Sequence, residues 1–245
     1  MPSKIPSGTV YTPTMSRAEA RRRVAWQEKV YRSHLKQTTP LDMNFNGRQL
    51  VVSPNVMAPV PFDLNLLSQA VIKEAKSSDS VLDLGTGSGA QAIMAASKAK
   101  RVLAVDVNPE AVNCARGNIA RNGLSSRIRV LRSDLFQRAK GRYSLILFDP
   151  PFRWTTPRDA WELCSADPGY RTLQAFFRES RSHLTPGGRV LLHFGTSADF
   201  AYLKHLIRAH GFRRQQVRKF QQDNGWSYFV LRLTVASNTR RSTNI

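Results

Sequence analysis

Five short apolar runs, most of them separated by stretches of helical pattern, dominate the middle of the chain. The runs are rich in Val, Leu and Ile, and they lie at 80–85, 101–107, 128–134, 144–150 and 189–195. The helix-like stretches lie at 90–98, 109–122, 169–184 and 198–210. Continuous apolar strands that alternate with helices are typical of a parallel sheet covered on both faces. The pattern therefore predicts an α/β fold with an open, doubly wound sheet.

The end of the chain departs from this alternation. Residues 213–221 and 226–236 have the composition of two strands, and Asp223-Asn224-Gly225 between them is a turn sequence. Two strands joined by so short a turn form an antiparallel hairpin. We therefore expect the parallel sheet to be completed by an antiparallel hairpin.

The N-terminal region has a different character. Residues 1–15 carry Pro, Ser, Thr and Gly without an apolar period, which indicates a flexible lead. Residues 16–36 contain neither Gly nor Pro, and Ser16 with Glu19 forms a capping box, so we expect a basic helix there. These features divide the chain into an extension at 1–45, one α/β domain at 46–236, and a disordered basic tail at 237–245.

Charge narrows the range of partners. The 245 residues include 37 Lys and Arg against 17 Asp and Glu, a net charge of +20. Such an excess favours a polyanionic partner, RNA or a ribosome-associated protein, although a generally basic proteome would give the same charge.

No apolar run approaches the roughly 18 residues of a membrane span, and two cysteines with no metal-ligand spacing indicate a metal-free cytoplasmic protein.

A glycine-rich turn follows the first apolar run. Its sequence is Asp83-Leu84-Gly85-Thr86-Gly87-Ser88-Gly89, and the next run ends in Asp106. Glycines allow a sharp turn and a close approach of ligand to backbone, and an acid at this distance accepts from ribose hydroxyls. The same turn satisfies a loose dinucleotide fingerprint, so a nicotinamide-dependent oxidoreductase stays open at this point.

The fourth run leads directly into Asp149-Pro150-Pro151-Phe152. Two prolines end the strand and stiffen the corner at the carboxyl edge of the sheet, where α/β sheets bind ligands. Asp149 and the Pro150 carbonyl offer acceptors, and Phe152 offers a flat apolar face. This set suits a planar –NH₂ group that is to be positioned for attack on a methyl group.

The motifs VLDLGTGSGAQAI, VDVNPEAVNCARGNIARNGL, SDLF and LILFDPPF, in this order, resemble class I S-adenosylmethionine-dependent methyltransferases. The resemblance is greatest to the HemK-type, or small methyltransferase domain, branch, and it covers roughly residues 51–212. It implies a seven-stranded Rossmann-like sheet, S-adenosyl-L-methionine as cofactor, and N-methylation as the activity. The residues implied in cofactor binding are Asp83, Gly85, Thr86, Gly87, Gly89, Asp106, Val107, Asp134 and Leu135, and those implied in holding the acceptor amino group are Asp149, Pro150 and Phe152.

Two departures from the family pattern widen the range of acceptors. HemK-type enzymes typically have Asn-Pro-Pro-Tyr where this chain has Asp-Pro-Pro-Phe, and their larger N-terminal helical domain is represented here by about one helix. The acceptor therefore remains a nucleic-acid base, a protein glutamine or a small metabolite. We also expect His193 to be a core or edge residue, and Trp154, Trp161 and Tyr170 either to line a pocket or to anchor a loop.

Overall fold

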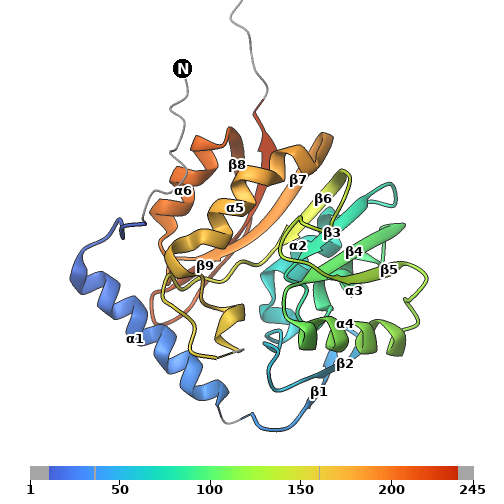
Figure 1. The fold of residues 1–245 in the computed structure, drawn as a ribbon, viewed down its shortest axis with the longest axis horizontal. Coiled ribbons are helices and arrows are strands. Elements are labelled where there is room, and N and C mark those ends of the chain that lie inside the picture. Colours follow the sequence, from blue (N-terminus) through green and yellow to red (C-terminus); the bar gives the residue numbers. More distant parts are fainter. Residues whose placement is uncertain (1–10, 36, 160, 237–245) are drawn as a thin grey trace, which may run out of the picture.

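A seven-stranded sheet forms the centre of the protein in the computed structural model, which describes residues 11–35, 37–159 and 161–236 (Figure 1). The strand order is β5-β4-β3-β6-β7-β9-β8. Strands β3 to β7 pair in parallel, and β9 is antiparallel to both of its neighbours, so β9 alone is reversed. The strands are β3 (Ser80–Leu84), β4 (Arg101–Asp106), β5 (Ile128–Arg132), β6 (Tyr143–Phe148), β7 (Leu184–Gly195), β8 (Phe212–Gln221) and β9 (Ser227–Val235).

Helices cover both faces of this sheet. The apolar cluster on one face contains α2 (Leu66–Glu74), α3 (Ala90–Ala95) and α4 (Pro109–Arg121), and the cluster on the other contains α5 (Arg171–Ser180) and α6 (Phe200–Ala209). Neighbouring residues of one strand belong to different clusters, as Leu145 and Ile146 of β6 do. The continuous apolar runs of the sequence reflect this burial on both faces. The predicted fold, a doubly wound and mostly parallel sheet with an antiparallel C-terminal hairpin, is confirmed.

A second, two-stranded sheet was missed by the sequence analysis. Strands β1 (Leu41–Phe45) and β2 (Arg48–Val52) pair as an antiparallel hairpin across the domain boundary that was expected between residues 45 and 46. Their two-residue turn is Asn46-Gly47, and both residues have positive φ. This is the preferred sequence of a type I′ hairpin turn. The signal was present, but the exposed polar strand β1 lacks an apolar run.

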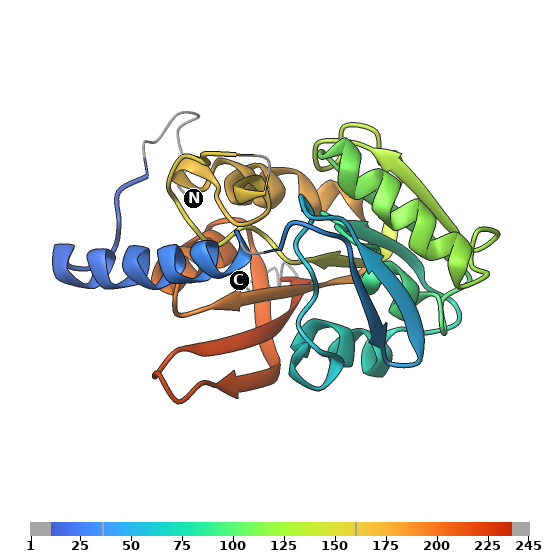
Figure 2. The ribbon, with the colours of Figure 1, turned by 90° about the horizontal axis from the view of Figure 1, so that it is seen from below.

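The N-terminal segment packs on the outside of the domain. Helix α1 (Arg17–His34) begins after Ser16, whose hydroxyl accepts from the Glu19 amide, as the capping box predicted. In both ribbon views α1 lies beside the segment that follows β6 (Figures 1 and 2). The first ten residues and the expected tail at 237–245 lie outside the described residues. No helix of the described part combines the length and apolarity needed to cross a bilayer.

Short 3-10 helices connect the main elements. They are η1 (Phe62–Leu64), η2 (Glu162–Cys164), η3 (Pro168–Tyr170) and η4 (Arg181–His183). Two of them, η2 and η3, belong to the long segment between β6 and α5, which begins at the Asp-Pro-Pro-Phe corner. This segment and the glycine-rich turn both leave the carboxyl edge of the sheet, so that edge is the place to look for a site.

Candidate active site

The glycine-rich turn connects β3 to α3 and has the conformation that its glycines allow. Gly85, Gly87 and Gly89 all have positive φ, a region that other residues rarely adopt. A Cβ on Gly89 would lie 3.3 Å from Ala115, so this glycine also allows α3 and α4 to pack closely. A Cβ on Gly85 would meet nothing within 4 Å. The turn therefore presents its backbone to open space, where a ligand can approach.

Asp83 lies at the base of this turn and is only 2% exposed. The Thr86 hydroxyl donates to its carboxylate over 2.7 Å, and the Thr86 amide donates to the Val105 carbonyl over 3.0 Å. Burial raises the pKa of Asp83 to about 7, because the charged form loses its hydration; the Thr86 hydroxyl opposes this shift and the Asp106 charge adds to it. No ion pair to Asp83 forms within the described ranges. A buried carboxylate without a cationic partner suits a ligand that brings a cationic group.

Asp106 ends β4 beside the same turn. Its two carboxylate oxygens accept from the amides of Gly87 and Asn108, each over 2.9 Å. Burial raises the pKa of Asp106, against the opposing effect of these amides. Each oxygen keeps a lone pair that can accept from a ligand hydroxyl. The next residue, Val107, is 52% exposed and offers an apolar surface beside the acid.

The turn after β5 approaches the same edge. Ser133 donates its amide to the carbonyl of Asp106 over 2.9 Å, which ties this turn to the acid at the end of β4. Asp134 is exposed, and Leu135 has a φ of 41°, uncommon for a residue with a side chain. Such outliers are concentrated at ligand sites. Both residues therefore lie beside Asp106 at the same edge of the sheet.

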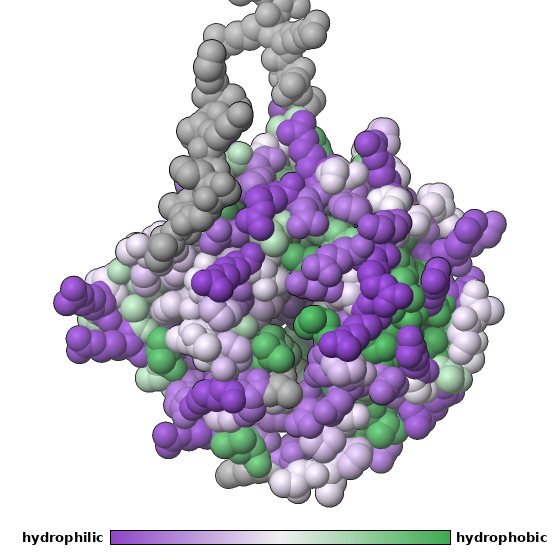
Figure 3. Space-filling model, viewed as in Figure 1, coloured by the Kyte–Doolittle hydropathy of each residue, from purple (hydrophilic) through white to green (hydrophobic). Residues whose placement is uncertain are grey.

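The Asp-Pro-Pro-Phe corner is level with the glycine-rich turn. Leu84, the last residue of β3, pairs with Phe148, the last of β6, so Gly85 and Asp149 leave neighbouring strands at the same height. Neighbouring strands are about 4.8 Å apart. One small ligand can therefore contact both the turn and the corner. In the view of Figure 3 the surface of the molecule is hollowed near its centre, between the side that carries α5 and the side that carries α4.

Within the corner, the three predicted residues have different surroundings. The Asp149 side chain is 46% exposed, whereas Pro150 is buried and held rigid. Phe152 is half-buried, and its ring centroid lies 4.9 Å from that of Phe194. The corner therefore combines an accessible carboxylate with a fixed carbonyl and a fixed ring.

His193 was expected to be a core or edge residue, but it contacts the predicted acceptor acid. Its Nδ1 lies 2.9 Å from Oδ1 of Asp149, and its ring lies 5.5 Å from that of Phe152 and 6.0 Å from that of Tyr228. The planes of the His193 and Tyr228 rings are nearly parallel, at an angle of 27°. Sequence reasoning missed both residues because they come from β7 and β9. The contact depends on the pairing of Phe148 in β6 with Leu192 in β7, which no single motif indicates.

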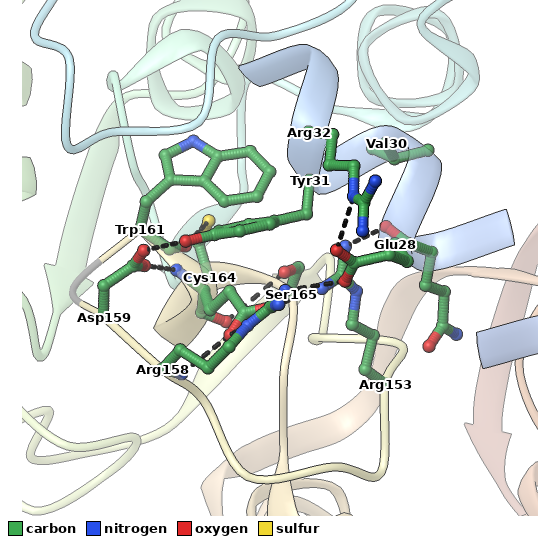
Figure 4. A network of polar contacts seen from close by, with 12 residues as sticks. Glu28, Val30, Tyr31, Arg32, Arg153, Arg158, Asp159, Trp161, Cys164 and Ser165 are labelled. Carbon is green, nitrogen blue, oxygen red and sulfur yellow. Dashed lines mark hydrogen bonds and ion pairs between the residues drawn. The ribbon is translucent and has the colours of Figure 1, made fainter. Parts of the chain in front are cut away.

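The segment after the corner is fixed by ion pairs against α1 (Figure 4). Arg153 is 5% exposed, pairs with the buried Glu162 over 2.6 Å, and donates to the Gln27 carbonyl in α1. Arg158 joins Glu162 to Glu28 of α1 over 2.6 and 2.9 Å. A cavity of about 250 Å³ lies between α1 and this segment.

Aromatic residues in the same segment act as anchors. Trp161 is 5% exposed and stacks on His34 at 3.8 Å, and Tyr170 is fully buried with its hydroxyl donating to the Phe152 carbonyl. Trp154 lies 6.2 Å from the Tyr11 ring. Of the two roles expected for these rings, anchoring the loop is the one their contacts support. Burial of the thiol raises the pKa of Cys164, and the Asp106 charge adds to this shift.

Comparisons with known proteins agree with this geometry. The model of the methyltransferase small domain family matches residues 53–218. A release factor glutamine methyltransferase of Cereibacter sphaeroides is 33% identical over 186 residues, which cover 71% of this chain and 66% of that protein. The chain thus spans less than two thirds of that relative. These matches favour methyl transfer over the hydride transfer that the glycine turn alone left open.

Two solved structures share the fold. The ribosomal protein L11 methylase of Lactobacillus delbrueckii subsp. bulgaricus has a TM-score of 0.56 at 22% identity, over 76% of this chain and 84% of that one. The tRNA m1G37 methyltransferase of Methanocaldococcus jannaschii has a TM-score of 0.60 at 19% identity, over 82% and 58%. At these identities the likeness is one of architecture, and it confirms the predicted Rossmann-like sheet.

Proposed function

The chain belongs to the methyltransferase small domain family, and we propose that it transfers a methyl group from S-adenosyl-L-methionine to a planar amino or amide nitrogen. One observation carries the proposal: β3 and β6 end in register, which brings the glycine-rich turn level with the Asp-Pro-Pro-Phe corner. A site for a small cationic ligand and a site for an amino group therefore adjoin. The reaction needs both groups in contact, with water excluded from the line between them.

The residues around the turn fit this cofactor. Buried Asp83, with no cationic partner in the described ranges, suits the amino group of the methionine end, and Gly85, Thr86, Gly87 and Gly89 leave room for it. Asp106 and Val107 would hold the ribose, and Asp134 and Leu135 the adenine. When bound, the cofactor supplies an electrophilic methyl group on a positively charged sulfur.

The corner would prepare the acceptor nitrogen. The lone pair of an amide or aromatic amino nitrogen is delocalised, which makes it a poor nucleophile. Asp149 and the Pro150 carbonyl would accept its two N–H groups, and Phe152 would stack on the conjugated plane. Acceptors on both N–H bonds raise the electron density on nitrogen, and Asp149 then takes the proton that the methylated nitrogen must lose. Positioning and electrostatics supply most of the rate.

We propose a macromolecular acceptor, either a protein glutamine or a nucleic-acid base. A protein glutamine is supported by the release factor methyltransferase of Cereibacter sphaeroides, and a nucleic-acid base by the net charge of +20. A small metabolite is the third alternative. RNA or a ribosome-associated protein is accordingly the partner that we propose.

The proposal also assigns parts of the chain. Residues 46–236 would form the methyltransferase domain, 1–45 an extension and 237–245 a basic tail. The first boundary falls in the β1–β2 hairpin, whose strands pair across it. The extension is thus attached through paired structure as well as through the α1 contacts.

Calorimetric titration tests the cofactor. We expect the protein to bind S-adenosyl-L-methionine and not NAD, and Asp106→Asn to weaken binding by about tenfold, the value of one lost hydrogen bond to a charged acceptor. Binding of NAD alone would contradict the proposal. Methyl transfer is then assayed with labelled cofactor on ribosomal RNA, tRNA and release factors, each separated and analysed by mass spectrometry.

Asp149→Ala tests the acceptor role. Since Asp149 would contact the acceptor and not the cofactor, we expect transfer to fall by at least about a hundredfold while the dissociation constant for S-adenosyl-L-methionine changes less than twofold. The matched control is Asp42→Ala, which removes an exposed acid of the β1–β2 hairpin. It should leave both the transfer rate and the dissociation constant unchanged. Wild-type turnover by Asp149→Ala would show that the corner does not hold the acceptor.

A further inference from the structure

We propose that His193 is a positioning residue for Asp149: its Nδ1–H fixes one carboxylate oxygen so that the other faces the acceptor nitrogen. This inference rests on the proposed function and deepens it. It concerns a contact between β6 and β7 that the sequence motifs do not describe. It also offers a physical reason for an aspartate at the first position of the corner.

The backbone brings the two side chains together. Phe148 of β6 pairs with Leu192 of β7, so the residues that follow, Asp149 and His193, are neighbours at the carboxyl edge. Nδ1 lies 2.9 Å from Oδ1, a normal hydrogen-bond distance. A carboxylate is an acceptor, so Nδ1 must carry the proton, in both the neutral and the charged imidazole.

A carboxylate in this place needs such a partner. The two oxygens of Asp149 are chemically equivalent, and the side chain is 46% exposed, so rotation would cost little without a donor. His193 is the one side chain of the described ranges that bonds this carboxylate. Holding Oδ1 leaves Oδ2 free to accept an N–H of the substrate. An asparagine, with one oxygen and one nitrogen, would be oriented by different partners.

The histidine is itself held in place. Its ring packs against those of Phe152 and Tyr228, which also pack against each other with centroids 6.3 Å apart, and its backbone pairs with Val230 of β9. The Tyr228 ring in turn lies over Gly195, where a Cβ would come within 2.6 Å of it. Only glycine at 195 leaves space for this ring. The aromatic packing therefore limits the positions that Nδ1 can take.

The role in proton transfer follows from this arrangement. The acceptor nitrogen would form a bond to the methyl carbon as the bond from that carbon to the cofactor's sulfur breaks and leaves its electron pair on sulfur. The nitrogen would lose one proton, which Oδ2 of Asp149 takes and later passes to water. The hydrogen bond from Nδ1 remains on Oδ1 throughout. His193 thus acts through Asp149 and needs no contact with the substrate.

Kinetics of His193 variants test the role. His193→Phe keeps a ring but removes the donor, and we expect kcat to fall tenfold to a hundredfold, roughly the effect of one charge-assisted hydrogen bond, with KM nearly unchanged. His193→Asn places an amide donor near the position of Nδ1 and should recover most of the loss. The matched control is His210→Phe, a half-buried ring against Phe177 at the far end of α6, which should keep wild-type kcat.

A double-mutant cycle separates positioning from general destabilisation. If His193 acts through Asp149, His193→Phe should cause no further loss in the Asp149→Ala background, which has no oxygen for Nδ1–H to bond. Additive losses, or an unchanged kcat in His193→Phe alone, would overturn the proposal. Thermal melting of each variant identifies those that fail to fold.

The tautomer of His193 gives a readout that does not depend on catalysis. Nitrogen NMR of the cofactor-free protein should show neutral His193 protonated at Nδ1, and in Asp149→Ala the proton should move to Nε2 in most molecules. An Nε2 proton in the wild type would contradict the inference even if methyl transfer is confirmed. Conversely, if His193 carries its proton on Nδ1 but the protein neither binds S-adenosyl-L-methionine nor transfers methyl groups, the proposed function is wrong and the His193–Asp149 contact stands.

Discussion

The buried carboxylate of Asp83 opposes folding, and in the proposed function it would bind the cofactor. It is almost fully buried, and its hydrogen bond from Thr86 does not compensate for the lost hydration, so its pKa is raised to about 7. A buried charge of this kind persists in a protein when a ligand supplies the missing partner. The residue is thus better suited to the loaded protein than to the free one.

Replacing Asp83 with Asn should change how stability depends on pH. In the wild type the folded state keeps this proton up to about pH 7, whereas the unfolded chain releases it near 3.8. Folding therefore loses stability from Asp83 as the pH rises from about 4 to 7, by about 1.4 kcal/mol for each unit of the shift. Relative to wild type, Asp83→Asn should gain stability over this range and remain constant above it.

Urea denaturation of both proteins from pH 4 to pH 8 measures this difference without cofactor. Taking the difference removes the contributions of groups that do not interact with Asp83, and leaves that of Asp106, whose charge raises the pKa of Asp83. The same variant should bind S-adenosyl-L-methionine more weakly, because the amide carries no charge. A stability difference that does not vary with pH would mean that Asp83 is ionised in the free protein throughout.

Helix α1 and the segment after the corner depend on one another. Arg153 donates to the Gln27 carbonyl of α1 and Arg158 pairs with Glu28 of α1, while both arginines pair with Glu162 of the segment. Tyr31 of α1 donates to Asp159 of the segment. The hydrogen bonds to Glu162 from Arg158 lower the pKa of Glu162, so it is ionised at neutral pH. The acceptor corner is therefore supported by an element more than a hundred residues away in the sequence.

Glu162→Gln should loosen this contact. It leaves the buried guanidinium of Arg153 without its ion-pair partner, and breaking a buried pair costs about 3–5 kcal/mol. We expect the free energy of unfolding to fall by a few kcal/mol and amide hydrogen exchange to increase in α1. The matched control, Arg32→Gln, breaks the exposed pair with Glu28 and should cost less than about 1 kcal/mol.

Either of two results would show that the network is not a support. One is an equal effect of Glu162→Gln and Arg32→Gln on stability. The other is unchanged hydrogen exchange in α1, which would mean that the helix is held by its remaining contacts, such as Gln27 with the Ser197 carbonyl.

Periodicity predicted the parallel strands of the main sheet and the helices that cover it, because their apolar residues are the buried ones. Strand β4, expected at 101–107, is Arg101–Asp106, and α4, expected at 109–122, is Pro109–Arg121. Strand β7 begins earlier than its apolar run, since Leu184 already pairs with Tyr143 before a shift in register. The sequence Pro186-Gly187-Gly188 concealed that part of the strand.

The site was predictable where it depends on one segment and unpredictable where it depends on several. The glycine turn, Asp106 and the corner are local motifs, and the parallel sheet places them on one edge. The contact of Asp149 with His193 depends on the register between β6 and β7, and the stacking of Tyr228 depends on β9 returning beside β7. The pairing register between strands that are distant in the sequence cannot be predicted from the motifs themselves.

On the scale of the whole molecule, the net charge of +20 either attracts a polyanionic acceptor or keeps the protein in solution. Lys29 and Arg21 are exposed on α1, the helix that supports the acceptor corner. Lys100 and Arg101 are exposed at the start of β4, at the opposite edge of the sheet. The two pairs carry equal charge at different distances from the site, so they make a matched comparison.

If the acceptor is RNA, its affinity should fall steeply with salt, because each phosphate that is neutralised releases a counterion. We expect Arg21→Gln with Lys29→Gln to lower the slope of log affinity against log salt by about two, one for each contact, and Lys100→Gln with Arg101→Gln to leave it unchanged. Filter binding from 50 to 300 mM salt measures both. Equal slopes in the two variants would mean that the charge acts without a defined surface, and a release factor methylated at a salt-independent rate would assign the acceptor nitrogen to glutamine.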